Sequence, residues 1–162
     1  MLATRPSALA RRLVASCLTA LVLTVTQPGA QASQPNLDLA QYRGQVVIVD
    51  FWASWCKPCR QSIPWLNQLR ARYGSRGLVI IGVNVDAERA DADRFLREVP
   101  IDFEVVYDSQ GALAGQFRLQ GMPSTFIFDR AGKLAATHMG FREKQREQHE
   151  NEIQYLLTGE AR

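Results

Sequence analysis

The sequence predicts an α/β fold in which a central mixed β-sheet is flanked by helices. Three observations predict it. Residues 46–53 and 78–86 are apolar runs rich in β-branched side chains, which is typical of strands buried on both faces. Residues 55–73, between these runs, repeat apolar side chains at helical spacing. The last third of the chain carries a hairpin pattern, which adds antiparallel strands to the sheet, and then a helix.

The first strand and helix have the clearest patterns. Residues 46–53 are apolar throughout except for Asp50. The helix expected over residues 55–73 carries Pro58 in its first turn, where proline is tolerated. The glycines between residues 74 and 77 end this helix.

The middle of the chain alternates strand and helix patterns. The buried strand over residues 78–86 leads into a charged helix over residues 88–98, which Pro100 closes. A short strand over residues 103–108 and a short helix over residues 111–117 follow. These elements continue the parallel part of the predicted sheet.

The end of the chain reads as a hairpin and a helix. Strands are expected over residues 124–129 and 134–140, joined by a turn that contains glycine. A polar helix over residues 142–157 has its apolar residues near its end, where it docks. In such a fold, chemistry gathers where a parallel strand ends and a helix begins.

The first 32 residues differ from the rest of the chain. Three arginines precede an apolar run over residues 13–25, and a small-residue site ends at Ala32. This order predicts a secretory signal peptide over residues 1–32, cleaved after Ala32, and a single domain over residues 33–162. The apolar run is shorter than the ~20 residues that a spanning helix needs, which favours cleavage over retention as an anchor. We therefore expect an exported protein that meets a membrane only through this segment.

The charge of the mature chain argues against one class of function. The whole chain has a formal net charge of +3, but three of its 19 basic residues lie in the signal segment, whereas its 16 acidic residues lie beyond it. The mature chain is therefore nearly neutral and has no basic cluster, so its charge gives no support for nucleic-acid binding. Cleavage also removes Cys17, which leaves Cys56 and Cys59 in an oxidising compartment.

Four explanations compete for two cysteines three positions apart. A structural disulfide would close so short a loop that it would stabilise the fold by only about 2 kcal/mol. A zinc site needs two more ligands, and the mature chain offers only His138 and His149. A copper carrier lacks suitably placed ligands for the same reason. Redox catalysis is the remaining explanation, and it implies no metal and no organic cofactor.

The residues around the pair favour redox catalysis on physical grounds. A sulfur at a helix N-terminus lies among N–H groups without intrahelical partners and near the positive end of the dipole, so its thiolate is stabilised. Cys56 is placed to benefit. Lys57 is either a further tuning charge or a solvated surface residue, and Pro58 stiffens the turn and removes one donor. Cys59, one turn further into the helix, should be shielded and attack only an adjacent sulfur.

The stretch "VVIVDFWASWCKPCR", residues 46–60, resembles the active-site segment of the thioredoxin superfamily. Together with "GMPSTFIFD", residues 121–129, it resembles the exported TlpA/ResA-like branch of thiol-disulfide oxidoreductases. The resemblance spans about residues 37–157. It implies a thioredoxin-like fold with a TlpA-type insert, over about residues 88–117, between the second strand and the strand that follows a cis-proline.

The resemblance also implies roles for further residues. It implies that the Met122–Pro123 bond is cis and faces the cysteines, although most such bonds are trans and the residues alone would suggest trans. Pro123 then keeps a backbone donor away from the sulfurs, and Met122 offers its main chain to an extended substrate. Trp55 is expected to shape the substrate surface, and Trp52 to support the active-site helix from beneath.

Two features depart from this branch. Many of its members carry asparagine where this chain has Asp50 and glutamate where it has Ser62, and the leading hairpin common in the branch is mostly missing. A carboxylate at the end of a buried strand is costly to ionise, so its pKa should rise toward the range of a proton acceptor. Asp50 is then the candidate base for Cys59; the alternative is a capping or hydrogen-bonded structural aspartate.

The resulting hypothesis, carried by the resemblance, is a monomeric periplasmic thiol-disulfide oxidoreductase. It would reduce disulfides of envelope proteins such as apocytochrome c, with electrons from a membrane thiol reductant of the DsbD or CcdA type. The residues between the cysteines do not decide between reductant and oxidant, since dithiol potentials range from about −270 to about −120 mV. The main alternative is a thioredoxin-like module that binds partners or delivers copper through the same cysteines. A peroxiredoxin is disfavoured, because its Thr-x-x-Cys context is absent here.

Overall fold

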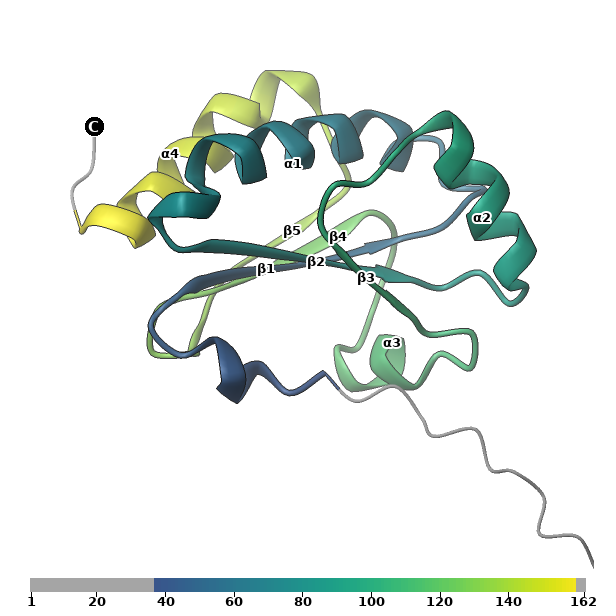
Figure 1. The fold of residues 1–162 in the computed structure, drawn as a ribbon, viewed down its shortest axis with the longest axis horizontal. Helices are drawn as coiled ribbons and strands as arrows, with labels where there is room; N and C mark the ends of the chain where they lie inside the picture. Colours follow the sequence, from purple (N-terminus) through teal and green to yellow (C-terminus); the bar gives the residue numbers. More distant parts are fainter. Residues whose placement is uncertain (1–36, 160–162) are drawn as a thin grey trace, which may run out of the picture. The chain divides into compact units, whose positions relative to one another are not determined.

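The computed structural model describes residues 37–159, which fall within one compact unit (Figure 1). Strands, helices and short 3-10 turns alternate along this part of the chain. They follow in the order η1 (Leu39–Tyr42), β1 (Val46–Trp52), α1 (Cys59–Tyr73), η2 (Gly74–Arg76), β2 (Leu78–Asn84), α2 (Arg89–Glu98), β3 (Glu104–Tyr107), α3 (Ala112–Gln116), β4 (Ser124–Phe128), β5 (Leu134–Met139), η3 (Glu143–Gln145) and α4 (Arg146–Thr158).

Within residues 37–159, five strands form one sheet in the order β3-β2-β1-β4-β5. β1 pairs in parallel with β2, and β2 in parallel with β3, whereas β4 runs antiparallel to both β1 and β5. All seven residues of the central strand β1 are buried. The predicted mixed sheet is therefore confirmed, and β1 ends at the same edge as its parallel neighbours.

Successive side chains of β1 point into two cores on opposite faces of the sheet, because a strand has a period of two residues. Val46 and Ile48 pack with apolar residues of α1 and α4. Val47 and Phe51 pack on the other face, with residues of α3. Figure 1 shows α1 and α4 above the sheet and α3 below it. By the same alternation, Asp50 belongs to the face that α1 covers.

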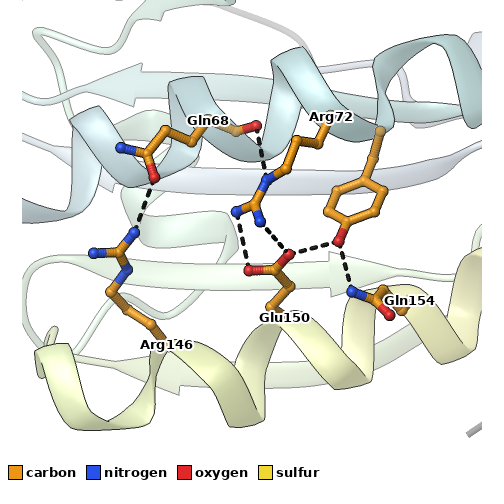
Figure 2. Close-up of polar contacts among 6 residues, drawn as sticks. Gln68, Arg72, Arg146, Glu150 and Gln154 are labelled. Atoms are coloured by element: carbon orange, nitrogen blue, oxygen red, sulfur yellow. Dashed lines mark hydrogen bonds and ion pairs between the residues drawn. The ribbon is translucent and has the colours of Figure 1, made fainter. Parts of the chain in front are cut away.

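A polar network joins α1 to α4 beside the apolar core (Figure 2). Arg72 of α1 lies 2.8 Å from the carboxylate of Glu150 on α4, and the Tyr73 hydroxyl donates to the same carboxylate at 2.5 Å. The Gln154 side-chain amide donates to the Tyr73 oxygen at 2.6 Å. These bonds fix the register of α4 against the helix that starts at the cysteines.

The predicted insert is present between β2 and β4, where α2, β3 and α3 follow one another. β3 extends the parallel part of the sheet by pairing with residues Ile81 to Asn84 of β2. Ala92 and Phe95 of α2 are buried against the end of β1. The insert therefore lies beside the edge of the sheet where the cysteines are.

The prediction of a helix over residues 55–73 is wrong at its start. Residues 55–58 form turns, and Pro58 is the N-cap of α1. Proline fits this cap because an N–H there would have no intrahelical partner, and the Ser62 N–H donates to the Pro58 carbonyl at 3.1 Å. Cys56 thus precedes the helix, and Cys59 is its first residue rather than a residue one turn inside it.

The predicted signal peptide over residues 1–32 lies outside the described residues. The described chain ahead of β1 contributes η1, whose first turn is capped by Asp38, the carboxylate accepting from the Ala40 N–H at 2.9 Å. In the part of the chain that the structure describes, no helix has the length and apolar character that crossing a membrane requires.

Candidate active site

The candidate site begins where β1 ends. After Trp52 the chain turns over residues 53–56, and the Cys56 N–H closes this turn by donating to the Ala53 carbonyl at 3.1 Å. Cys59 then opens α1. Both cysteines therefore lie at the C-terminal end of the central strand, as the order of elements predicts.

A disulfide joins Cys56 to Cys59, with 5.3 Å between their Cα atoms. Cys56 retains 4% of its surface exposed, whereas Cys59 retains none. The Cys59 N–H is shared between two acceptors of Cys56, the carbonyl oxygen at 3.1 Å and the sulfur at 3.3 Å. A donor from the first residue of a helix thus points at the Cys56 sulfur, where it would stabilise a thiolate.

An apolar cluster supports the disulfide from within the protein. The Trp52 ring is fully buried and lies 5.1 Å from the ring of Phe95 on α2. Arg60, next to Cys59, stacks over Phe95 at 4.8 Å and forms an ion pair with Glu98 at 2.8 Å. The insert helix α2 thus helps to close the site, and Trp52 lies where a supporting residue was expected.

The Met122–Pro123 peptide bond is cis, as the resemblance implies. Met122 packs against the apolar cluster that contains both cysteines, and Pro123 is buried just ahead of β4. The Pro123 carbonyl accepts a hydrogen bond from the Gly140 N–H at 2.7 Å. The fold therefore brings the Met122–Pro123 segment beside the cysteines.

Asp50 is buried in the middle of the sheet with 1% of its surface exposed. The hydroxyl of Thr125, its register partner on β4, donates to Oδ1 at 2.6 Å, while Oδ2 has no hydrogen-bond partner among the described residues. Burial raises the pKa of Asp50 to about 7, and the Thr125 bond offsets this only in part. Asp50 shares its sheet face with Trp52, whose apolar cluster contains both cysteines.

The rim of the site is exposed. Trp55 has 69% of its surface exposed, and Lys57 and Pro58 are exposed beside it. Met139, at the end of β5, is also 69% exposed, and its sulfur lies against Gly121 in the segment that leads to Met122. The sequence reasoning missed Met139, because a methionine at the end of an ordinary strand pattern carries no signal of this position.

A buried polar group next to the cysteine turn was also missed. Asp86, which follows β2, is 4% exposed and accepts hydrogen bonds from Ser54 and Asn84. Two polar residues at the end of an otherwise apolar strand were the available signal. Ser54 directly precedes Trp55, so this group contacts the segment that carries the nucleophile.

The two histidines considered as zinc ligands lie elsewhere. His138 and His149 stack on each other between β5 and α4, with ring centroids 3.9 Å apart, and His138 lies 2.7 Å from Glu152. Across residues 37–159, no cluster of three or more His, Cys, Asp or Glu side chains is arranged to hold a metal ion.

Curated relatives match the region that contains this site. The chain is 33% identical over 96 residues to the thiol-disulfide oxidoreductase ResA of Geobacillus thermodenitrificans, a match that covers 59% of this chain and 55% of the relative. It is 29% identical over 121 residues to a ResA of Bacillus cereus, covering 75% of this chain and 69% of the relative. The chain thus spans about half the length of the first of these relatives.

Solved structures match the fold. A protein from Chlorobium tepidum, provisionally named thiol:disulfide interchange protein DsbE, superposes with a TM-score of 0.72 at 44% identity, over 75% of this chain and 86% of that one. The thioredoxin-like superfamily protein SPOA0173 superposes with a TM-score of 0.66 at 27% identity, over 80% and 91%. The predicted thioredoxin-like fold is therefore confirmed.

A family model matches a large part of the chain. The model of the AhpC/TSA family matches residues 22–137, which include the cysteine pair, the insert and the cis-proline segment. The match covers more than half of the sequence. With its thioredoxin-like fold and its Cys56–Cys59 disulfide, the chain belongs to the AhpC/TSA family.

Proposed function

We propose that the protein is a thiol-disulfide oxidoreductase that works by dithiol–disulfide exchange through Cys56 and Cys59. The observation that carries this proposal is the asymmetry of the disulfide. Cys56 is the residue of the pair that keeps some exposure, and its sulfur has a donor at the helix N-terminus, whereas Cys59 is fully buried. One sulfur is suited to attack a substrate, and the other is suited to attack only its neighbour.

Exchange proceeds in two steps whose atoms and electrons balance. The Cys56 thiolate attacks one sulfur of a substrate disulfide, forms a mixed disulfide and displaces the other substrate sulfur as a thiolate. The Cys59 thiol then loses its proton and attacks Cys56, which releases the second substrate sulfur. The substrate gains two electrons and the protein ends as the Cys56–Cys59 disulfide, the state that the structure records.

Asp50 is proposed as the acceptor of the Cys59 proton, directly or through water. Its pKa of about 7 lets the carboxylate take a proton near neutral pH, and strand alternation puts its side chain on the sheet face whose apolar cluster contains the cysteines. Asp50→Asn should therefore slow the resolution of the mixed disulfide, chiefly near neutral pH. Stopped-flow measurement of that step across pH tests the role, and an unchanged rate would contradict it.

The proposed setting is the periplasm, and the proposed substrates are envelope proteins that carry disulfides, such as apocytochrome c. The names of the ResA relatives and of the DsbE-like structure support thiol-disulfide chemistry. The signal pattern at the start of the sequence supports export. The protein would act as a reductant, re-reduced by a membrane dithiol protein of the DsbD or CcdA type, and as a monomer.

Cys56→Ser tests the proposal directly. Insulin reduction by the reduced protein should be abolished in this variant, because Cys59, the other cysteine among residues 37–159, is fully buried. Retention of full activity would sink the mechanism. Stoichiometric copper binding by the wild-type protein, without any reductase activity, would instead favour a copper-delivery module. A redox titration of the Cys56–Cys59 couple then decides between reductant and oxidant.

A further inference from the structure

We propose that Asp86 is a positioning residue of this site, which holds the Cys56 turn in place through Ser54. The inference deepens the proposed function and rests on it. Asp86 follows β2, and Ser54 follows β1, its parallel neighbour. The two loops therefore leave the sheet side by side, and one of them carries the nucleophile.

The Asp86 carboxylate directs its hydrogen bonds to this junction. Its Oδ2 accepts from the Ser54 N–H at 2.9 Å and its Oδ1 from the Ser54 hydroxyl at 2.8 Å. The Asn84 side-chain amide donates to Oδ2 at 2.7 Å, and the Asp86 N–H donates back to Asn84 at 3.2 Å. With 4% of its surface exposed, Asp86 is a buried carboxylate whose bonds lead to the turn rather than to solvent.

Apart from the burial of Ala53 and Cys56 in the apolar cluster, the turn has two restraints. Among the hydrogen bonds of the described residues, those of residues 53–58 stay within the turn or bind the start of α1, except for the Ser54 bonds to Asp86. Trp55, Lys57 and Pro58 are exposed and add little packing. The disulfide is the second restraint, since it ties the turn to α1.

Reduction removes that second restraint at the moment when Cys56 has to act. The Asp86 carboxylate then keeps the turn against the sheet, so that the Cys56 sulfur stays within reach of the Cys59 N–H that it meets at 3.3 Å in the disulfide. A sulfur that drifts from this donor loses stabilisation of its thiolate. Two effects of removing Asp86 can be told apart by the pKa of the Cys56 thiol. Loss of the positioning role should raise this pKa, whereas removal of a nearby negative charge would by itself lower it.

The test measures the pH dependence of iodoacetamide alkylation of Cys56 in the reduced protein. In Asp86→Ala the midpoint should rise by about one pH unit, because the Cys56 thiolate loses stabilisation by the helix N-terminus. Alkylation below the midpoint should then be about tenfold slower. Ser54→Ala, which keeps the backbone N–H, should raise the alkylation midpoint less than Asp86→Ala does. The exchanged pair Asn84→Asp with Asp86→Asn restores one carboxylate and complementary donors, so its midpoint should rise by less than one pH unit, and this can be measured even if Asp86→Ala fails to fold.

Asp108→Asn is the matched control. Asp108 is also a buried aspartate, at 1% exposure, and it follows the next parallel strand, β3, but its carboxylate accepts from the Ala114 N–H, away from the cysteines. This variant should lose stability without moving the Cys56 midpoint. An unmoved or lowered midpoint in the Asp86 variants would overturn the positioning role. A wild-type midpoint at the ordinary value of about 8.5 would instead contradict the proposed function itself.

Discussion

At the scale of single residues, Asp50 has the most consequential environment. It is a carboxyl group with one hydrogen bond, to Thr125, and no cation near enough to pair with it among the ion pairs of the described residues. Its ionised form is therefore disfavoured, and the same burial that raises its pKa to about 7 should cost folding stability.

The pH dependence of that cost can be predicted with its sign. The folded pKa lies above the unfolded one, so the stability contributed by protonated Asp50 is fully present below about pH 4 and is lost as pH rises through about 7. Asp50→Asn should stabilise the disulfide form by up to about 4 kcal/mol at pH 8 and by about 2 kcal/mol at pH 5. Urea unfolding at both pH values tests this, and an equal gain at each would contradict the assigned pKa.

Trp55 should matter to binding and not to folding, because 69% of its surface is exposed. Trp55→Ala should change the free energy of unfolding by less than about 0.5 kcal/mol. It should raise KM several-fold for a disulfide-bonded protein and leave the reaction with a small disulfide unchanged, as only a protein covers the rim. Tyr155→Ala on α4 removes an aromatic side chain of 50% exposure and should leave both reactions unaffected.

At the scale of elements, the contact between β5 and α4 carries a pH-sensitive pair. His149 of α4 stacks on His138 of β5 and lies 6.3 Å from the Trp65 ring of α1, and Glu152 faces both histidines from α4. Burial is the largest cause that lowers the pKa of His149, His138 adds to it, and Glu152 opposes it. Protonation of His149 therefore opposes the docking of α4.

The stability that neutral His149 contributes is present above its unfolded pKa of about 6.5 and is lost as pH falls through its lower folded pKa. His149→Gln should therefore lose less stability than the wild-type protein between pH 8 and pH 5. Urea unfolding of both proteins at each pH gives the loss of stability in each. The difference between the two losses reports His149, because the groups that titrate in both proteins contribute equally. An identical loss in both proteins would show that His149 does not couple to folding.

The elements themselves were largely predictable, and the exceptions have physical reasons. The continuous apolar run of β1 and the turn glycines gave strand positions that the structure confirms to within a few residues. The start of α1 was misplaced because proline is compatible with both the first helical position and the cap that Pro58 occupies. The cis bond before Pro123 came from family resemblance, since local residues favour the trans form.

The site was predictable where its residues adjoin in sequence and not where the fold brings them together. Cys56, Cys59 and the burial of Asp50 could be read from one segment. The Ser54–Asp86 contact joins two loops 32 positions apart, and Met139 reaches Gly121 only through the pairing of β4 with β5. Neither contact has a sequence spacing of its own, so neither could be predicted without the sheet register.

At the scale of the whole molecule, the redox state and folding stability are linked. The disulfide closes a loop of four residues, which in the entropic account stabilises the folded state by about 2 kcal/mol relative to the reduced chain. If the protein is a reductant, its disulfide form should be the more stable one by at least this amount. Urea unfolding with and without dithiothreitol measures the difference. A reduced form that is the more stable one would show an oxidant, as in DsbA.

The burial of the two cysteines restricts which substrate disulfides the protein can attack. Cys56 has 4% of its surface exposed and Cys59 has none. A substrate disulfide can therefore reach Cys56 only if it lies on a flexible, projecting segment of the substrate protein. A disulfide buried in the core of a folded substrate cannot reach Cys56. We therefore expect the protein to act on substrate chains that are still unfolded and have not yet packed around their own cysteines.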